Sequence, residues 1–369
     1  MMGEQQGTGK VNRPDTPTGL DGPVRAQGGT VSMNRFFLFL GALALVAVAA
    51  FPLTWVPDPV PAAVLPDHQA PGVAWADEPL QPLPQIVSED PERVKIGRRL
   101  FHDPRLSKDG KVACSTCHDL RNGGDDGLPV SVGMGGAKGE INSPTVFNAA
   151  YNFRLFLDGR AATLEAQIDG PIHDSREMAS GWPRIIALLK RDSYYLNAFA
   201  TEYRDGITAA NVKDAIATYE RTLITPDSRF DRFLRGDQSA LNEEERTGYL
   251  AFKRYGCSSC HQGRNVGGNM YQKFGLFNEA ELLGDIHPMR HGRSFVTGLP
   301  EDIHVFRVPS LRNVALTAPY FHDGSAATMS QAVSEMAEHQ IGRKIPDEDV
   351  AQIVQFLNTL TGEYQGVPL

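Results

Sequence analysis

Three stretches of the chain space their apolar residues as an amphipathic α-helix does. In residues 211–224 the apolar positions include Val212, Ile216, Tyr219 and Leu223, and Pro226 follows where such a helix would end. The stretches 242–256, NEEERTGYLAFKRYG, and 346–362, PDEDVAQIVQFLNTLTG, also predict helices. The last one gathers five apolar residues on one face: Val350, Ile353, Val354, Leu357 and Leu360. The pattern therefore predicts a mainly α fold.

A long apolar run lies near the N-terminus. Residues 36–56 carry no charge, and 21 residues are enough to cross a bilayer once as a helix. Arg35 and three other basic residues precede the run, so the positive-inside rule predicts that everything after Val56 is exported. If translation starts at Met33, the same run is a signal peptide instead. Either alternative predicts export.

The segments around this run differ from it in composition. Residues 1–34 are poor in apolar groups and predict a disordered tail, and 57–87 are rich in proline and predict an extended linker. Folded sequence is expected to begin near Pro91. The chain has 369 residues, which is enough for two domains, and its net charge of −8 argues against nucleic-acid binding.

All the cysteines of the chain fall in two identical patterns. Cys114 and Cys117 belong to CSTCH, and Cys257 and Cys260 belong to CSSCH. In a C-x-x-C-H motif the thiols bind the vinyl groups of a c-type haem and the histidine ligates the iron. A zinc site and redox dithiols are the alternatives, but a histidine after both pairs and an exported protein favour haem. We therefore expect two covalent c-type haems, with His118 and His261 as proximal ligands.

The two halves of the chain resemble each other. Residues 143–168 and 308–333 align without a gap at a spacing of 165 residues, which indicates one fold used twice. The haem histidines are only 143 residues apart, so the second copy holds about 22 extra residues, which we assign to the loop around 275–293. The aligned identities include Pro144/Pro309, Asn148/Asn313, Ala150/Ala315, Phe156/Phe321, Asp158/Asp323, Gly159/Gly324, Ala161/Ala326, Ala162/Ala327 and Thr163/Thr328. Two cytochrome c-like domains are expected to meet near 225–228.

The two predicted haems have different candidate sixth ligands. Met336 in SEMAEHQIG has a thioether that would close the second haem, although a methionine in the core of a helix is the common alternative. Its counterpart at the spacing of 165 is Pro171, which has no ligating side chain. A haem that only transfers electrons tends to have two protein ligands, whereas a haem that performs chemistry needs an open position. The haems are therefore expected to differ in function.

From about residue 90 to 365 the chain resembles the bacterial dihaem cytochrome c peroxidases. The resemblance rests on LFHDPRLS, CSTCH, NSPTVFNA, DGRAATLEAQ, GPIHDSREM, TPDSRFDRFLRG, CSSCH, FRVPSLRNVALTAPYFHDG and FLNTLTG. It implies a peroxidatic cytochrome c-like domain over 88–225 and an electron-transfer domain over 226–369. His118 would then ligate the peroxidatic iron, and His261 and Met336 the iron that passes electrons in. The implied reaction is the two-electron reduction of hydrogen peroxide to water.

The resemblance also implies a set of site residues. Glu177 matches the catalytic acid/base of the family, which fits a reaction that moves a proton between the two peroxide oxygens. Gln167 and Phe156 match the polar and aromatic residues of the distal pocket. Without the motif, these three would be interpreted as a surface carboxylate, a helix-surface amide and a core ring. A calcium ion between the domains is implied near Asn142, Thr317 and Pro319, whose oxygens suit a hard cation.

The resemblance implies partners as well. These are a small electron-donor protein such as a cytochrome c or a cupredoxin, or a quinol if the membrane tether is kept, and a second copy of the chain in a homodimer. The implied location is the periplasm, with residues 36–56 as the alternative inner-membrane anchor.

The chain departs from the family pattern at two positions. The family usually has Trp between the haems where this chain has Leu157, and many members have a removable histidine where it has Met134. Met134 is a candidate weak ligand of the first haem, but we favour an open iron. His173 is an alternative distal residue, more simply interpreted as a surface histidine. Two other functions are an electron-transfer cytochrome without peroxide turnover and a tryptophylquinone-maturing enzyme, whose members have Tyr in place of Met336.

Overall fold

The computed structural model describes residues 78–277 and 291–369, which belong to one compact unit. The predicted disordered tail, the apolar run 36–56 and most of the predicted linker lie outside the described residues. Part of the predicted insertion, 278–290, lies outside them too. Among the described residues, no helix is both long and apolar enough to cross a membrane.

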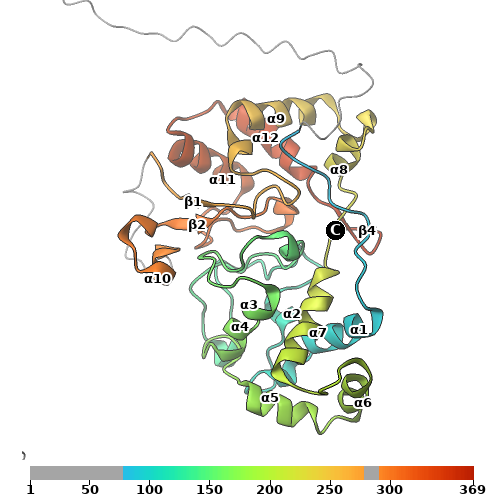
Figure 1. Cartoon of the computed structure of the whole chain (residues 1–369). Helices are drawn as coiled ribbons and strands as arrows, with labels where there is room; N and C mark the ends of the chain where they lie inside the picture. The colour runs from blue at the N-terminus through green and yellow to red at the C-terminus, as the bar shows by residue number, and fades with distance from the viewer. Residues whose placement is uncertain (1–77, 278–290) are drawn as a thin grey trace, which may run out of the picture. The chain divides into compact units, whose positions relative to one another are not determined.

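The described structure is mostly helical, as the sequence predicts, and its few strands are short (Figure 1). The helices up to residue 225 are α1 (Pro91–Phe101), α2 (Cys114–Cys117), α3 (Leu164–Gln167), α4 (Asp169–His173), α5 (Trp182–Leu189), α6 (Ser193–Glu202) and α7 (Ala209–Arg221). Those after it are α8 (Arg229–Leu234), α9 (Glu243–Arg254), α10 (Ser294–Thr297), α11 (Met329–Met336) and α12 (Asp347–Asn358). Two antiparallel pairs are formed by β1 (Tyr271–Lys273) with β2 (Val305–Arg307) and by β3 (Glu363–Tyr364) with β4 (Val367–Pro368).

The three helices predicted from apolar spacing are α7, α9 and α12. Each begins where the sequence supplies N-terminal stabilisation. Thr208 accepts a hydrogen bond from the backbone of α7, and Asn242 and Glu245 form a capping box on α9. Three acidic residues in the first turn of α12 complement its helix dipole.

Each half of the chain is built around one crossing pair of long helices. α1 packs against α7, and α9 packs against α12 (Figure 1). Both contacts depend on a glycine: a Cβ on Gly97 would lie 1.9 Å from the carbonyl oxygen of Ala215, and a Cβ on Gly248 would lie 1.9 Å from that of Gln352. The same close approach in both halves supports the predicted duplication.

The aligned segments have matching local structure. Leu155 bridges to Ala161 in the first copy, and Tyr320 bridges to Ala326 in the second, at the same spacing of 165 residues. Phe156 and Phe321 both adopt positive φ, at 62° and 72°. Thr163 caps α3, and Thr328 caps α11 in the same way. These correspondences support the prediction that one fold is used twice.

The repeated asparagines meet at the junction of the two halves. Asn148 donates from Nδ2 to Thr225 Oγ1 at 2.8 Å, and Asn313 donates from Nδ2 to the same oxygen at 3.0 Å. Asn148 Oδ1 accepts from the N–H of Thr225, and Asn313 Oδ1 accepts from that of Gly362. All of these groups are buried, so their mutual hydrogen bonds remove the cost of burying them.

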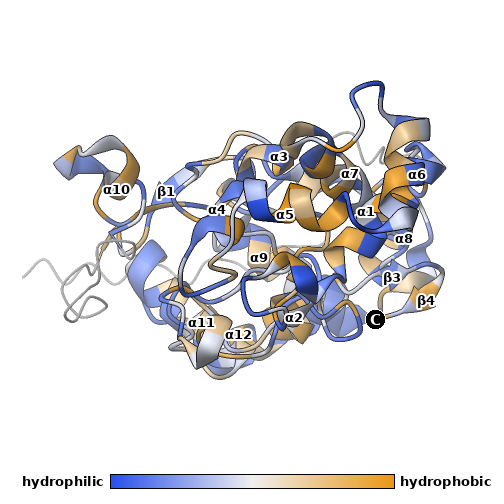
Figure 2. Cartoon of the chain, turned by 90° about the horizontal axis from the view of Figure 1, so that it is seen from below, coloured by the Kyte–Doolittle hydropathy of each residue, from blue (hydrophilic) through white to orange (hydrophobic). Residues whose placement is uncertain are grey.

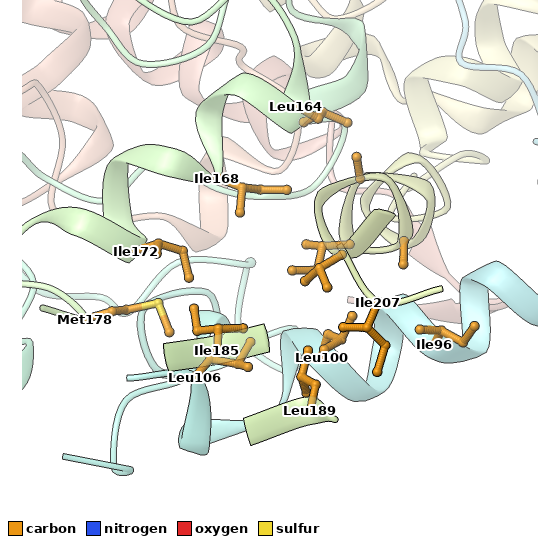
Figure 3. Close-up of a cluster of buried hydrophobic side chains, with 14 of the residues drawn as sticks. Ile96, Leu100, Leu106, Leu164, Ile168, Ile172, Met178, Ile185, Leu189 and Ile207 are labelled. Carbon is orange, nitrogen blue, oxygen red and sulfur yellow. The ribbon is translucent and has the colours of Figure 1, made fainter. Parts of the chain in front are cut away.

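Buried apolar side chains form separate clusters. The largest joins α1 with α3, α4, α5 and α7, and Figure 3 shows Leu100, Ile172, Ile185 and Leu189 directed to this common interior. In Figure 2, α5 and α7 show much of the hydrophobic colour in this region. A second cluster joins α8, α9 and α12, and a third joins Phe101 and Phe147 to the chain end near Tyr364. The split agrees with two domain cores, although the predicted boundary at 225/226 stays a prediction.

The start of the described chain differs from the expected linker. Leu80 and Leu83 are fully or almost fully buried, and Leu80 bridges to Gly263. Glu78 accepts hydrogen bonds from the Tyr249 hydroxyl and from Lys253 Nζ. Folded structure therefore begins before Pro91, because Leu80 packs into the core around α9 and Leu83 is buried as well.

Candidate functional site

The first haem motif, residues 114–118, forms the single turn α2 and the histidine after it. His118 Nδ1 lies 3.2 Å from the carbonyl oxygen of Gly124. Because a carbonyl only accepts, this contact places the ring hydrogen on Nδ1 and leaves Nε2 as the ligating nitrogen. Burial lowers the pKa of His118, which favours the neutral imidazole that binds iron.

The second haem motif, residues 257–261, starts with the turn η6 (Cys257–Ser259). Burial lowers the pKa of His261 to about 4, against weaker opposing contacts with the backbone of Val266 and Pro309. The ring is therefore neutral at physiological pH and suited to ligate a metal.

Three of the four thiols do not have the properties of redox cysteines. All four are free, and burial raises the pKa of Cys114 to about 12 and of Cys117 and Cys257 to about 11. A reactive cysteine would have a lowered pKa instead. Across 78–277 and 291–369, no three His, Cys, Asp or Glu side chains gather to hold a metal ion. Both observations favour thioether attachment of haem over the two alternatives.

A cavity of ≈ 380 Å³ lies beside the second haem motif. Cys257, Cys260 and His261 line it, and so does Met336. Most of the other lining is apolar, and α11 and α12 contribute Met329, Val333, Ile353 and Leu357 to it. An apolar cavity of this kind with a neutral histidine and a thioether fits a haem. The His261/Met336 pair stays a prediction, but the fold brings both residues to one cavity.

Met336 occupies a distinctive place in the helix that carries it. It is the last residue of α11, and the π-helical turn η10 (Ala337–Ile341) follows directly. Such turns are rare and often occur at functional sites. The first copy has no helix of this length at the corresponding place, because α3 and α4 are short and Pro171 lies within α4.

Glu177 lies beside the first haem motif. Its negative charge contributes to the raised pKa of both Cys114 and Cys117. Burial raises the pKa of Glu177 itself, and Asp174 adds to the increase, while Arg160 and Arg176 oppose it. A carboxyl group with a raised pKa next to a cofactor site is a candidate acid/base.

The loop with Met134 is attached to the turn with Glu177. The N–H of Met134 donates to the carbonyl oxygen of Glu177 at 2.9 Å. Arg176 pairs with Asp174 on the turn and with Glu140 after the loop. A Cβ on Gly133 would lie 2.1 Å from the carbonyl oxygen of Arg176, so only glycine permits this approach. The structure thus brings Met134 and Glu177 together beside the first haem motif.

Phe156 and Gln167 come from neighbouring elements of the same half. The Arg160 guanidinium lies 3.4 Å from the centre of the Phe156 ring, and Gly170 of α4 leaves room for the ring edge. Gln167 is half-buried at the end of α3. No direct contact joins either side chain to Glu177 among the described contacts. Their distal-pocket roles therefore stay predictions.

The three predicted calcium residues all line the cavity of the second haem motif. Asn142 comes from the first half, and Thr317 and Pro319 come from the second. The side chain of Asn142 donates from Nδ2 to the carbonyl oxygen of Leu128 at 2.8 Å, which leaves Oδ1 as an acceptor. Oxygen atoms from both halves at one place are compatible with a calcium site.

Leu157, one of the two departures from the family pattern, and the alternative distal residue His173 have clear positions. Leu157 lines the cavity, and its carbonyl oxygen accepts from the N–H of Arg307 at 2.7 Å. His173 is exposed, and its Nδ1 lies 2.8 Å from the carbonyl oxygen of Asp169. His173 therefore fits the interpretation of a surface histidine.

Arg307 and Glu220 are among the buried ionisable residues that were not singled out from the sequence. Arg307 is 3% exposed and lines the cavity, and Glu220 on α7 is 6% exposed. Burial raises the pKa of Glu220 to about 8, with a further contribution from Glu165. The only sequence signal for Arg307 is one charge within the apolar stretch VFRVPSL. Nothing in the sequence around Glu220 indicates that it lies on the buried face of its helix.

The chain is similar to known proteins of one family. The sequence profile of the family described as "Di-haem cytochrome c peroxidase" matches residues 91–239. The Cytochrome c551 peroxidase of Nitrosomonas europaea is 44% identical over 79% of this chain and 86% of its own length. The Cytochrome c peroxidase Ccp of Escherichia coli K12 is 47% identical over 78% of this chain. The matched region spans 62% of the E. coli protein.

A solved structure shares the fold. The crystal structure of a MauG-like protein associated with microbial copper homeostasis has a TM-score of 0.67 and 30% sequence identity. The match covers 77% of this chain and 93% of that protein. Both sequence relatives carry the name of the enzyme class that the sequence analysis predicts.

Proposed function

This chain belongs to the di-haem cytochrome c peroxidase family, and we propose that it reduces hydrogen peroxide to water with two electrons from a protein donor. The observation that supports this most directly is the place of Glu177, a half-buried carboxyl group beside the first haem motif with a raised pKa. When bound, the haems would supply the iron that takes up peroxide and the electrons that reduce it.

The proton chemistry falls to Glu177 in this proposal. Reduction of hydrogen peroxide consumes two electrons and two protons and yields two molecules of water. The Glu177 carboxylate would accept a proton from one peroxide oxygen and return it to the other, which then leaves as water. Arg160 and Arg176 lower the pKa of Glu177 and so keep its carboxylate available. Gln167 would hydrogen-bond the peroxide, and Phe156 would limit the entry of water.

The two haem motifs are given different roles. Cys114, Cys117 and His118 would hold the haem at which peroxide is reduced. Cys257, Cys260, His261 and Met336 would hold the haem that receives electrons from a cytochrome c, a cupredoxin or a quinol. The cavity with both His261 and Met336 supports this direction, since two protein ligands suit electron transfer.

Further parts of the proposal concern the setting of the enzyme. Calcium would bind to Asn142, Thr317 and Pro319 and join the two halves at the cavity beside the second haem motif. The protein would act in the periplasm, with residues 36–56 as an anchor or a cleaved signal, and would form a homodimer. These parts rest on the family resemblance and on the export signal of the sequence.

Steady-state turnover of hydrogen peroxide with reduced cytochrome c as donor tests the main proposal. We expect peroxide-dependent oxidation of the donor by the full-length haem-loaded protein. No turnover, together with two six-coordinate haems in every oxidation state, would favour a pure electron-transfer cytochrome. Oxidation of a partner protein in place of peroxide turnover would favour the tryptophylquinone-maturing type, which Met336 in place of Tyr argues against.

A further inference from the structure

Arg307 is a buried cation in the wall of the cavity beside the second haem motif. It is the last residue of β2 and is 3% exposed. Burial lowers its pKa to about 10, so the guanidinium still carries a positive charge at physiological pH. Its position in the cavity wall places this charge beside the space that His261 and Met336 also line.

The hydrogen bonds of Arg307 all go to neutral groups. Nε donates to the carbonyl oxygen of Phe156 at 3.2 Å. Nη1 donates to Asn152 Oδ1 at 3.2 Å and to the carbonyl oxygen of Val308 at 3.4 Å. In the described part of the chain, no carboxylate pairs with Arg307 and Nη2 makes no hydrogen bond. Two donors of the guanidinium are thus left without a partner among the described residues.

A second buried arginine, Arg312, has the carboxylate partner that Arg307 lacks among the described residues. Arg312 is equally buried and lines the same cavity, but it forms an ion pair with Asp231 at 2.8 Å. Arg312 also donates to Ser228 Oγ and to the carbonyl oxygen of Gln81. A buried charge without a partner is strongly destabilising. Arg307 therefore needs a partner of negative charge, whereas Arg312 already has one.

We propose that Arg307 is the counter-ion of a haem propionate in the cavity beside the second haem motif and raises the reduction potential of that haem. The inference rests on the proposed function, because it requires haem at the second motif. A guanidinium presents its donors in a planar fork that suits a carboxylate. Its charge favours the reduced state, which has one positive charge fewer at the iron.

The same residue is also connected to the first half. Its backbone N–H and its Nε donate to the carbonyl oxygens of Leu157 and Phe156, two consecutive residues. Asn152, which accepts from Nη1, also accepts from Asn265 Nδ2 near the second haem motif. Arg307 thus acts as a positioning residue that fixes the Phe156–Leu157 segment relative to the cavity beside the second haem motif.

The test compares Arg307→Gln with Arg264→Gln in the full-length, haem-loaded protein. Both changes remove one positive charge, but Arg264 is exposed, three residues after His261, and solvent screens its charge. Spectroelectrochemical titration gives the midpoint potential of each haem. In Arg307→Gln we expect the oxidised-to-reduced ratio of the second haem at a fixed potential to rise about tenfold, which is about 59 mV for one electron. The first haem and Arg264→Gln should change little.

Arg307→Lys separates the charge from a purely structural role. It keeps the charge and loses the fork, so we expect a midpoint potential between those of the wild type and Arg307→Gln. The propionate bending modes in the resonance Raman spectrum should shift in both Arg307 variants and not in Arg264→Gln. Unchanged potentials and unchanged propionate modes in both Arg307 variants would overturn the inference. Failure of the proposed function is distinguishable, because it appears in the wild type as absent peroxide turnover.

Discussion

The backbone N–H of Met134 donates a hydrogen bond to the carbonyl oxygen of Glu177, with 2.9 Å between the two atoms. The loop that carries a candidate iron ligand is thereby attached to the turn that carries the candidate acid/base. A movement of this loop would displace Glu177 as well. The hydrogen bond uses backbone atoms only, so a substitution of the Met134 side chain leaves it intact.

The first prediction concerns the Met134 side chain. We expect Met134→Leu to leave peroxide turnover unchanged, because leucine keeps the size of the side chain and the backbone hydrogen bond while it removes the thioether. The first haem of the half-reduced enzyme should be high-spin in both proteins by electron paramagnetic resonance. A low-spin His118/Met134 pair that persists in the half-reduced wild type would contradict the open site.

The second prediction concerns Gly133. A Cβ at this position would lie 2.1 Å from the carbonyl oxygen of Arg176, whereas a Cβ on Gly139 of the same loop would meet its nearest atom at an ordinary 3.5 Å. We therefore expect Gly133→Ala to separate the loop from the Glu177 turn and to lower kcat/KM, with a loss of stability of about 1–3 kcal/mol. Gly139→Ala is the matched control. Equal effects of the two variants would show that the close approach is unimportant.

The third prediction concerns the pH dependence of turnover. As a base, Glu177 acts only when it is ionised, so activity should fall as the pH drops through its raised pKa. Glu177→Gln should lower kcat/KM by about 10²–10⁴-fold and abolish this acidic limb, with unchanged haem spectra. The exposed Glu92→Gln on α1 serves as the control. An acidic limb that persists in Glu177→Gln would assign the titration to another group.

The fourth prediction concerns stability. The folded-state pKa of Glu220 is raised to about 8, so the folded protein holds a proton there that the unfolded chain releases near its ordinary pKa. The contribution of Glu220 to stability is fully present below the unfolded-state pKa and is lost as the pH rises to about 8. Glu220→Gln should flatten this decline by up to about 1.4 kcal/mol per pH unit.

Thermal unfolding of the haem-loaded protein between pH 5 and pH 8 measures this effect. Glu301→Gln, at an exposed position, should keep the slope of the wild type. If Glu220→Gln also keeps it, then Glu220 is ionised in the folded protein and the assignment is wrong.

The fifth prediction concerns calcium. Asn142→Ala removes a side-chain oxygen of the proposed site, and we expect calcium affinity to fall by at least about tenfold in isothermal titration calorimetry. A chelator should lower the unfolding temperature of the wild type more than that of Asn142→Ala. Asn197→Ala, at an exposed position on α6, is the control and should bind calcium normally. Normal calcium affinity in Asn142→Ala would remove this residue from the site.

Much of the fold could be predicted from the chain because its signals are local. α7, α9 and α12 follow from apolar spacing and N-terminal caps, which act within a few residues. The duplication is predicted by a gapless alignment. Phe156 and Phe321, which are aligned, both have positive φ, so the identical residues around them form the same turn. The haem motifs are as local, since each fits within five residues.

The predicted linker is the clearest difference. Prolines between 57 and 84 predict an extended linker, and residues 78–84 form neither a helix nor a named strand. Nothing in its composition indicates that Leu80 bridges to Gly263 or that Leu83 is buried, because the partners are more than a hundred residues away.

The sequence by itself predicted which residues would attach the haems, where α7, α9 and α12 lie and that the fold occurs twice. Only the tertiary structure decided that Glu177 lies beside Cys114, that Met134 is attached to it, and that Arg307 is buried without a carboxylate partner among the described residues. The physical reason is distance along the chain. Spacing and capping act between near neighbours, whereas burial, pKa shifts and the pairing of charges depend on segments that only folding brings together.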